Sequence, residues 1–257
     1  PAACTADGPS GLRMEGKATQ LPIGTALSAS WNPELVRELY TMEGMELCRN
    51  EVDTLLGPGV NIHRHPLNGR NFEYYSEDPY LSGTMSVAST GGIKDGGAWG
   101  TIKHFALNSQ ESHRFKIDAV CSERAIREIY LKSFEMAVKE GTVMTLMTSY
   151  NPINGHWAAS NYDLCTTVLR EEWGYKGIVM TDWWAKMNDV VEKGEESNQK
   201  TRDMVRSQND VYMVVNNNGA EINSNNDDTE SAVEGGRLTV GELQRAAINI
   251  CNFILNA

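Results

Sequence analysis

Short apolar runs alternate with longer amphipathic segments along the whole chain. The apolar runs, rich in β-branched residues or Met, predict strands at 2–6, 53–60, 101–105, 143–149, 177–181 and 210–215, with a further candidate at 23–27. The amphipathic segments predict helices at 33–49, 123–139, 164–173 and 240–254. Repeated strand–helix alternation requires a parallel sheet with right-handed crossovers. The fold is therefore either a doubly wound sheet or a barrel.

Polar residues follow almost every predicted strand at its carboxyl end: Asp7, His63, Arg64, His65, Lys103, His104, Tyr150, Asn151, Asp182, Trp183 and Trp184. Barrels gather their catalytic groups at these strand ends, whereas a doubly wound sheet concentrates them at one switch point, often with a Gly-rich phosphate loop. The GPGVN run at 57–61 is not the GxGxxG dinucleotide pattern. The pattern favours an α/β fold, a (β/α)8 TIM-type barrel, in one catalytic domain spanning 1–257. Because fewer than eight strands are predicted, we expect an incomplete barrel whose first strand is missing or lies upstream.

Charge and cysteine content narrow the choice of partners. The net charge of −11 argues against nucleic acid and membrane, because both favour a basic surface. The five cysteines are scattered without a CxxC pair, so they predict neither a disulfide framework nor a zinc site. Reduced thiols and the lack of a leader point to a cytoplasmic protein, although a secreted or periplasmic one is left open because the chain begins at Pro1. A homo-oligomer is also left open.

Six ordered blocks of the chain are similar to one known family. They are DGPSGLR (7–13), GPGVNIHRHPLNGRNFEYYSEDP (57–79), KHFALNSQE (103–111), MTSYNPINGHWAASN (147–161), LREEWGYKGIVMTDWW (169–184) and LTVGELQRAAINICNFI (238–254). Together they resemble glycoside hydrolase family 3, whose nearest known members are β-glucosidases. The resemblance implies a TIM-type barrel and a retaining β-glycosidase acting on a β-glucoside or β-linked oligosaccharide. It implies no cofactor and no metal.

The resemblance also implies roles for individual residues. Asp182, in MTDWW, matches the nucleophile, and Trp183 beside it matches a wall of the subsite. The positions that match contacts to the non-reducing sugar are Asp7, Arg70, Lys103, His104, Arg114 and Tyr150. Physical chemistry agrees: a carboxylate stabilises an oxocarbenium-like transition state, and cations donate strong hydrogen bonds to sugar hydroxyls. We expect these cations to hold the pKa of Asp182 low.

Each assignment has a structural alternative. Asp182 could cap a helix, and His104, Tyr150 and Trp183 could be packing residues. Arg70 and Arg114 could serve as ion-pair partners of Glu73 and Glu111, their near neighbours in the sequence. Glu73 and Asp78 are expected to fix the loop that carries Arg70.

The general acid/base is not found among the predicted site residues. The chain reads KHFALNSQESHR where the hexosaminidase branch of the family carries a KHFPGHG-type loop, so that branch is rejected. The resemblance implies an acid/base from an α/β sandwich domain that precedes the barrel, and Glu111 is the alternative within this chain. Three other functions stay open: a β-xylosidase or other exo-β-glycosidase, a non-catalytic sugar-binding fragment, and a metal-dependent barrel hydrolase built on His63, His65, Lys103, His104, His113 and Asp182.

Overall fold

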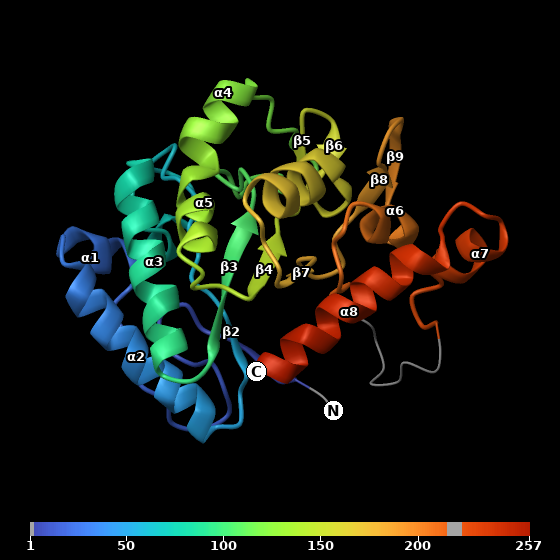
Figure 1. Cartoon of the computed structure of the whole chain (residues 1–257). Coiled ribbons are helices and arrows are strands. Elements are labelled where there is room, and N and C mark those ends of the chain that lie inside the picture. The colour runs from blue at the N-terminus through green and yellow to red at the C-terminus, as the bar shows by residue number, and fades with distance from the viewer. Residues whose placement is uncertain (1–2, 215–222) are drawn as a thin grey trace.

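The computed structural model describes residues 3–214 and 223–257. Its centre is a five-stranded sheet of order β1-β2-β3-β4-β7, in which every neighbouring pair is parallel (Figure 1). The strands are β1 (Thr5–Asp7), β2 (Thr54–Leu56), β3 (Trp99–Phe105), β4 (Thr145–Thr148) and β7 (Ile178–Met180). Strand order follows chain order without reversal, which is the topology of a barrel rather than of a doubly wound sheet. The predicted TIM-type, incomplete α/β barrel is confirmed, since the described strands do not close into a ring.

Helices connect and cover the strands. They are α1 (Gly24–Ala29), α2 (Pro33–Arg49), α3 (Pro79–Asp95), α4 (Glu123–Ala125), α5 (Lys132–Lys139), α6 (Thr201–Arg206), α7 (Thr229–Glu234) and α8 (Val240–Asn256). Shorter or wider helical turns are η1 (Asn71–Glu73), η2 (Ile126–Tyr130), η3 (Ala158–Ser160) and η4 (Asp163–Glu172). Two hairpins, β5 (Pro152–Ile153) with β6 (His156–Trp157) and β8 (Met187–Asp189) with β9 (Lys193–Ser197), project beyond the sheet in Figure 1.

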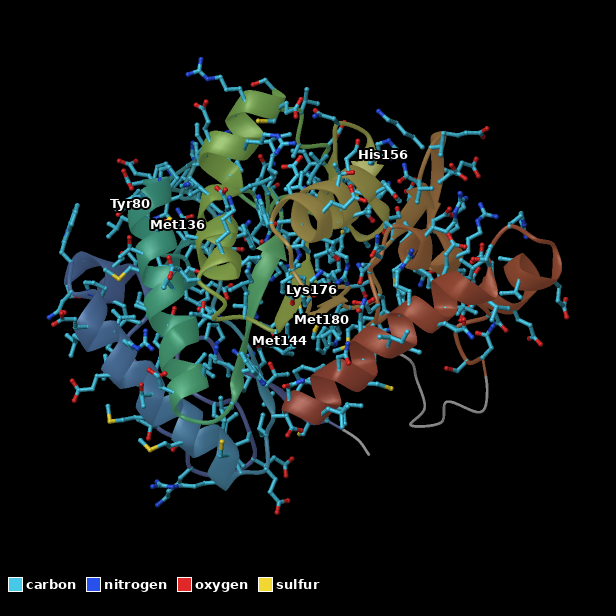
Figure 2. The ribbon with its side chains drawn as sticks, in the orientation of Figure 1. Tyr80, Met136, Met144, His156, Lys176 and Met180 are labelled. Atoms are coloured by element: carbon cyan, nitrogen blue, oxygen red, sulfur yellow. The ribbon has the colours of Figure 1, made fainter. Side chains whose placement is uncertain are left out.

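Helix α3 was absent from the sequence-based prediction because its sequence, PYLSGTMSVASTGGIKD, is rich in Ser, Thr and Gly. Asp78 caps its first turn by accepting from the Leu81 N–H at 2.6 Å. The small residues are needed for close packing. A Cβ on Gly92 would lie 2.3 Å from the Arg37 carbonyl of α2, and one on Gly83 would lie 2.2 Å from Met136 Sδ of α5 (Figure 2 labels Met136). Tertiary packing therefore outweighs the weak helix propensity.

Four other predictions from the sequence need correction. The candidate strand at 23–27 is wrong, because Gly24–Ala29 forms α1. The strand predicted at 210–215 is reduced to one parallel bridge between Met180 and Val211, and position 215 lies outside the described residues. The predicted helix at 123–139 is interrupted by the π-turn η2, and the one at 164–173 is the π-type helix η4.

Helix α8 lies across the open side of the sheet (Figure 1). Its Phe253 is buried in a cluster with Leu56, Met147, Ile178 and Met180 from β2, β4 and β7, and Figure 2 labels Met180 beside this helix. The Trp99 indole also donates to the carbonyl of Asn256 at 2.9 Å. The helix thereby covers apolar surface that a closed ring of strands would otherwise bury.

Within the sheet, a layer of buried threonines joins three strands. The hydroxyls of Thr54, Thr101 and Thr145 lie within 3.2 Å of one another, so each buried hydroxyl has a partner. All five cysteines are free. In residues 3–214 and 223–257, no helix combines the length and apolar character needed to span a bilayer.

Candidate active site

A pocket of about 290 Å³ opens at the carboxyl ends of the strands. It is lined by Asp7, Leu56, Arg70, Lys103, His104, Arg114, Met147, Tyr150, Asp182 and Trp183. All eight site residues predicted from the sequence are in this group, so the structure brings them together. Leu56 and Met147, at the ends of β2 and β4, were not predicted, although their places at strand ends gave a signal. A larger cavity of about 540 Å³, between η2, η4 and the β5–β6 hairpin, shares no residue with this pocket.

The buried Lys103 pairs with the partly exposed Asp7 across the sheet. Lys103 is near the end of β3 and only 5% exposed, and its Nζ donates to Asp7 Oδ1 at 3.0 Å. Arg13 lies 3.2 Å from the other carboxylate oxygen. Burial alone would raise the pKa of Asp7, but Lys103 and Arg13 outweigh it and lower that pKa. Asp7 is therefore an ionised acceptor, suited to sugar hydroxyls.

The two arginines come from loops and are held by nearby glutamates. The Arg70 Nε donates to Glu73, and Arg114 pairs with Glu111 at 2.7 Å. These are the ion pairs of the structural alternative, yet both guanidinium groups also line the pocket. The Arg114 guanidinium also lies 5.1 Å from the centre of the Tyr150 ring. Ion pairing thus fixes the arginines in place while leaving them in the pocket wall.

Asp182 follows β7 by two residues and is 8% exposed. Its Oδ2 lies 3.7 Å from Nε2 of His104. The expectation of a low pKa is wrong: burial raises the pKa of Asp182 to about 6, although Lys103, the Tyr150 hydroxyl, Arg70 and Arg114 oppose the rise. Loss of hydration outweighs the cations because water is nearly excluded from this carboxyl group.

The turn after Asp182 has an unusual backbone. Trp183 and Trp184 have φ values of 44° and 51°, a left-handed conformation that side chains other than Gly rarely adopt. Thr181 anchors the turn, since its N–H donates to the Val211 carbonyl at 2.9 Å and its hydroxyl accepts from the Met213 N–H at 2.8 Å. Such strain is typical of functional sites, and here it directs the Trp183 side chain into the pocket wall.

The pocket offers few carboxyl groups that could act as a general acid. Among the described residues that line it, only Asp7 and Asp182 carry carboxyl groups, and Asp7 is held ionised. Glu111, the alternative within this chain, is engaged by Arg114 and by the Asn108 amide at 3.1 Å. In the described part of the chain, His, Cys, Asp and Glu form no group of three that could hold a metal ion. The metal-hydrolase alternative therefore gains no support from the donor geometry.

Fold and pocket together define an α/β-barrel protein whose site suits a neutral, polyhydroxylated ligand. Cations and an ionised carboxylate provide donors and acceptors for hydroxyl groups, and Trp183 and Tyr150 provide apolar ring surface.

Comparison with known proteins then identifies the family. The model of the glycosyl hydrolase family 3 N-terminal domain matches residues 1–253, and the chain belongs to this family. It is 52% identical to a β-glucosidase of Ruminococcus albus over all of the chain and 27% of that protein. It is 40% identical to an exo-α-(1→6)-L-arabinopyranosidase of Bifidobacterium breve over 96% of the chain and 32% of that protein.

A solved structure gives the same result. A β-glucosidase from Paenibacillus barengoltzii matches 99% of the chain with a TM-score of 0.98 and 69% identity, and the match covers 28% of that protein. The chain thus spans about a quarter to a third of the length of these relatives.

Proposed function

We propose that this chain supplies the sugar pocket and the nucleophile of a retaining β-glycosidase that releases non-reducing terminal β-D-glucosyl residues. The observation that carries the proposal is the placement of Asp182, nearly buried in a pocket shared with Lys103, Arg70 and Arg114. A carboxylate surrounded by cationic hydrogen-bond donors can hold a sugar and attack it from the same pocket. The names of the R. albus and P. barengoltzii relatives support the choice of β-glucosides.

The reaction proceeds in two displacements. The Asp182 carboxylate attacks the anomeric carbon, the glycosidic C–O bond breaks, and the leaving oxygen takes a proton from a general acid. Water then attacks the same carbon, Asp182 leaves as a carboxylate, and the acid/base group recovers its proton from the water. The Lys103, Arg70 and Arg114 side chains would orient the sugar hydroxyls through both steps.

The acid/base group is proposed to come from a second domain, an α/β sandwich, because neither carboxyl group of the pocket can serve. Asp182 is the nucleophile, and the lowered pKa of Asp7 keeps it from donating a proton at neutral pH. The relatives are three to four times longer than the matched region, which is consistent with such a domain.

A second candidate is another exo-glycosidase activity, such as that of a β-xylosidase or an arabinopyranosidase. It is supported by the name of the B. breve relative, which is 40% identical to this chain.

Trapping of the covalent intermediate tests the proposal. The full-length enzyme is incubated with an activated 2-deoxy-2-fluoro β-glucoside, whose good leaving group needs no acid, and intact mass is followed by peptide mapping. We expect a gain of one fluorosugar on the peptide that contains Asp182. Asp182→Asn should stay unlabelled, and Asp163→Asn, which removes an exposed carboxylate, should be labelled like the wild type. Labelling only by the matching xyloside or arabinopyranoside would favour the second candidate, and no labelling by any of them would favour a non-catalytic sugar-binding role.

A further inference from the structure

Behind the pocket, His104 is fixed on both sides by neighbours that do not reach the sugar site. The Asn61 side chain holds its backbone, since Asn61 Nδ2 donates to the His104 carbonyl at 2.9 Å and Asn61 Oδ1 accepts from the His104 N–H at 2.8 Å. The imidazole is 3% exposed, with Nδ1 3.1 Å from the Tyr74 hydroxyl and Nε2 3.7 Å from Asp182 Oδ2. One ring nitrogen thus faces Tyr74 and the other faces the nucleophile.

The imidazole is neutral, so only one of these nitrogens carries a hydrogen. Burial lowers the pKa of His104 well below its ordinary value, and the positive charges of Arg70, Lys103 and Arg114 lower it further. In a neutral imidazole one nitrogen is a donor and the other an acceptor, and the hydrogen bond at one decides the role of the other.

The partners of Tyr74 settle the direction of its hydrogen bond. Asn108 Nδ2 lies 3.0 Å from the Tyr74 oxygen and 3.1 Å from Glu111 Oε1. A carboxylate only accepts, so the Asn108 atom between these two groups is the amide nitrogen, which only donates. The Tyr74 oxygen therefore accepts from Asn108, and its own hydrogen is directed to His104 Nδ1.

The Tyr74 ring has little freedom to turn away. It is fully buried, and it packs so closely on Gly59 that a Cβ there would lie 2.8 Å from its ring carbons. Burial also raises the pKa of Tyr74 far above its ordinary value, so the hydroxyl keeps its hydrogen. The rings of Tyr74 and His104 meet edge to face with their centres 6.2 Å apart.

We propose that Tyr74 is a positioning residue of the active site: by donating to Nδ1, it holds His104 as the Nε2–H form and makes the nitrogen in the pocket a donor. A donor at Nε2 faces the Asp182 carboxylate, and it can stabilise that charge or donate to a sugar hydroxyl bound beside it. In the opposite tautomer a lone pair would face the carboxylate and oppose its charge. The effect on turnover rests on the proposed glycosidase function, whereas the tautomer does not.

The chain contains a matched control for this role. Tyr75, the next residue, is also buried and makes its hydroxyl contact with Ser89 Oγ at 2.7 Å, away from His104. Tyr74→Phe and Tyr75→Phe each remove one buried hydroxyl while keeping the ring. A general loss of packing or of one buried hydrogen bond should affect both variants alike. Only the loss of the preference of His104 for the Nε2–H tautomer should be specific to Tyr74→Phe.

The test is made by NMR on full-length enzyme labelled with 15N-histidine, in which two-bond 1H–15N correlations report which ring nitrogen carries the hydrogen. The signals of His104 are identified as those that are missing from the spectrum of His104→Asn. We expect hydrogen on Nε2 in the wild type and in Tyr75→Phe, and a mixture of tautomers in Tyr74→Phe. The kcat/KM for an aryl β-glucoside should fall about tenfold in Tyr74→Phe, the worth of one hydrogen bond, and less than about twofold in Tyr75→Phe.

Hydrogen on Nδ1 of the wild type would overturn the proposal even if neither variant folded. An unchanged tautomer in a folded Tyr74→Phe, or an equal loss of kcat/KM in both variants, would overturn it as well. An enzyme that is inactive on every glycoside would overturn the proposed function, whereas the tautomer of His104 could still be measured by NMR.

Discussion

Glu43 lies on α2, where the residue is 3% exposed. Neither carboxyl oxygen has a hydrogen-bond partner of good geometry among the described residues, and no described cation pairs with it. Burial raises the pKa of Glu43 from 4.5 to about 8, and Glu46 adds to the rise while the Gly11 backbone opposes it. The folded protein therefore holds a proton on Glu43 at neutral pH that the unfolded chain releases.

The sign of the effect on stability follows from this difference. Below pH 4.5 the Glu43 carboxyl group is protonated in both the folded and the unfolded protein, so its protonation does not change the free energy of unfolding. Between pH 4.5 and about 8 the unfolded state binds fewer protons, so the free energy of unfolding falls as pH rises. At about 1.4 kcal/mol per pH unit, the loss at pH 7 is about 3 kcal/mol. Glu43→Gln, a neutral side chain of the same shape, should remove this loss.

We expect Glu43→Gln to match the wild type at pH 4.5 and to exceed it by about 3 kcal/mol, or roughly 6 °C in Tm, at pH 7. Thermal and urea unfolding from pH 4.5 to 8 measure the difference between the two proteins, in which all other titrating groups cancel. Glu38→Gln, on the exposed side of the same helix, is the control and should follow the wild type throughout. Parallel curves for Glu43→Gln and the wild type would refute the reasoning.

Three further predictions follow from the site and the core. The kcat/KM should fall about tenfold per pH unit below about pH 6, because protonation of Asp182 removes the nucleophile; a pH–rate profile that is flat from pH 4 to 7 contradicts this. Asp182→Gly should lower kcat at least about a thousandfold while added azide restores part of the turnover as an inverted glycosyl azide, and near-normal turnover without azide excludes the assignment. Arg170→Met should lower the free energy of unfolding in urea by about 3 kcal/mol, because it leaves the buried Asp210, paired with Arg170 at 2.6 Å, without its cation. Arg127→Met, which breaks an ion pair at the surface, should lower it by less than about 1 kcal/mol. Equal losses in the two variants would contradict the burial argument.

Site residues at strand ends were predictable because parallel strands place their carboxyl ends on one edge of the sheet. Once the strands were recognised, it followed that the residues at their ends would converge on one pocket, namely Asp7, Lys103, His104 and Asp182. Loop residues did not follow from periodicity. The roles of Arg70 and Arg114 came only from the family resemblance, because the positions of both side chains depend on ion pairs with glutamates that sequence spacing suggests but does not fix.

Three-dimensional burial was the information that the sequence lacked. The pKa of Asp182 depends on how much water the surrounding loops exclude, and charge counting alone gave the wrong direction. Tyr74 carries no mark in the sequence that separates it from Tyr75, since only the fold places one hydroxyl on His104 and the other on Ser89. The short strand predicted at 23–27 failed for a related reason: an apolar run of this length fits a helical turn equally well.

The position of α8 across the open sheet has a consequence for how the chain folds during synthesis. The contact between Trp99 and Asn256 joins residues 157 positions apart, among the most non-local contacts in the domain. The strands leave the ribosome long before α8 does, so Met147, Ile178 and Met180 stay uncovered until α8 docks. Contacts between residues far apart in the sequence form slowly, so the docking of α8 is expected to be slow. The intermediate that precedes docking exposes an apolar surface that can bind other chains. Burial of these strand residues therefore depends on α8, and delayed release of α8 should favour aggregation or chaperone binding.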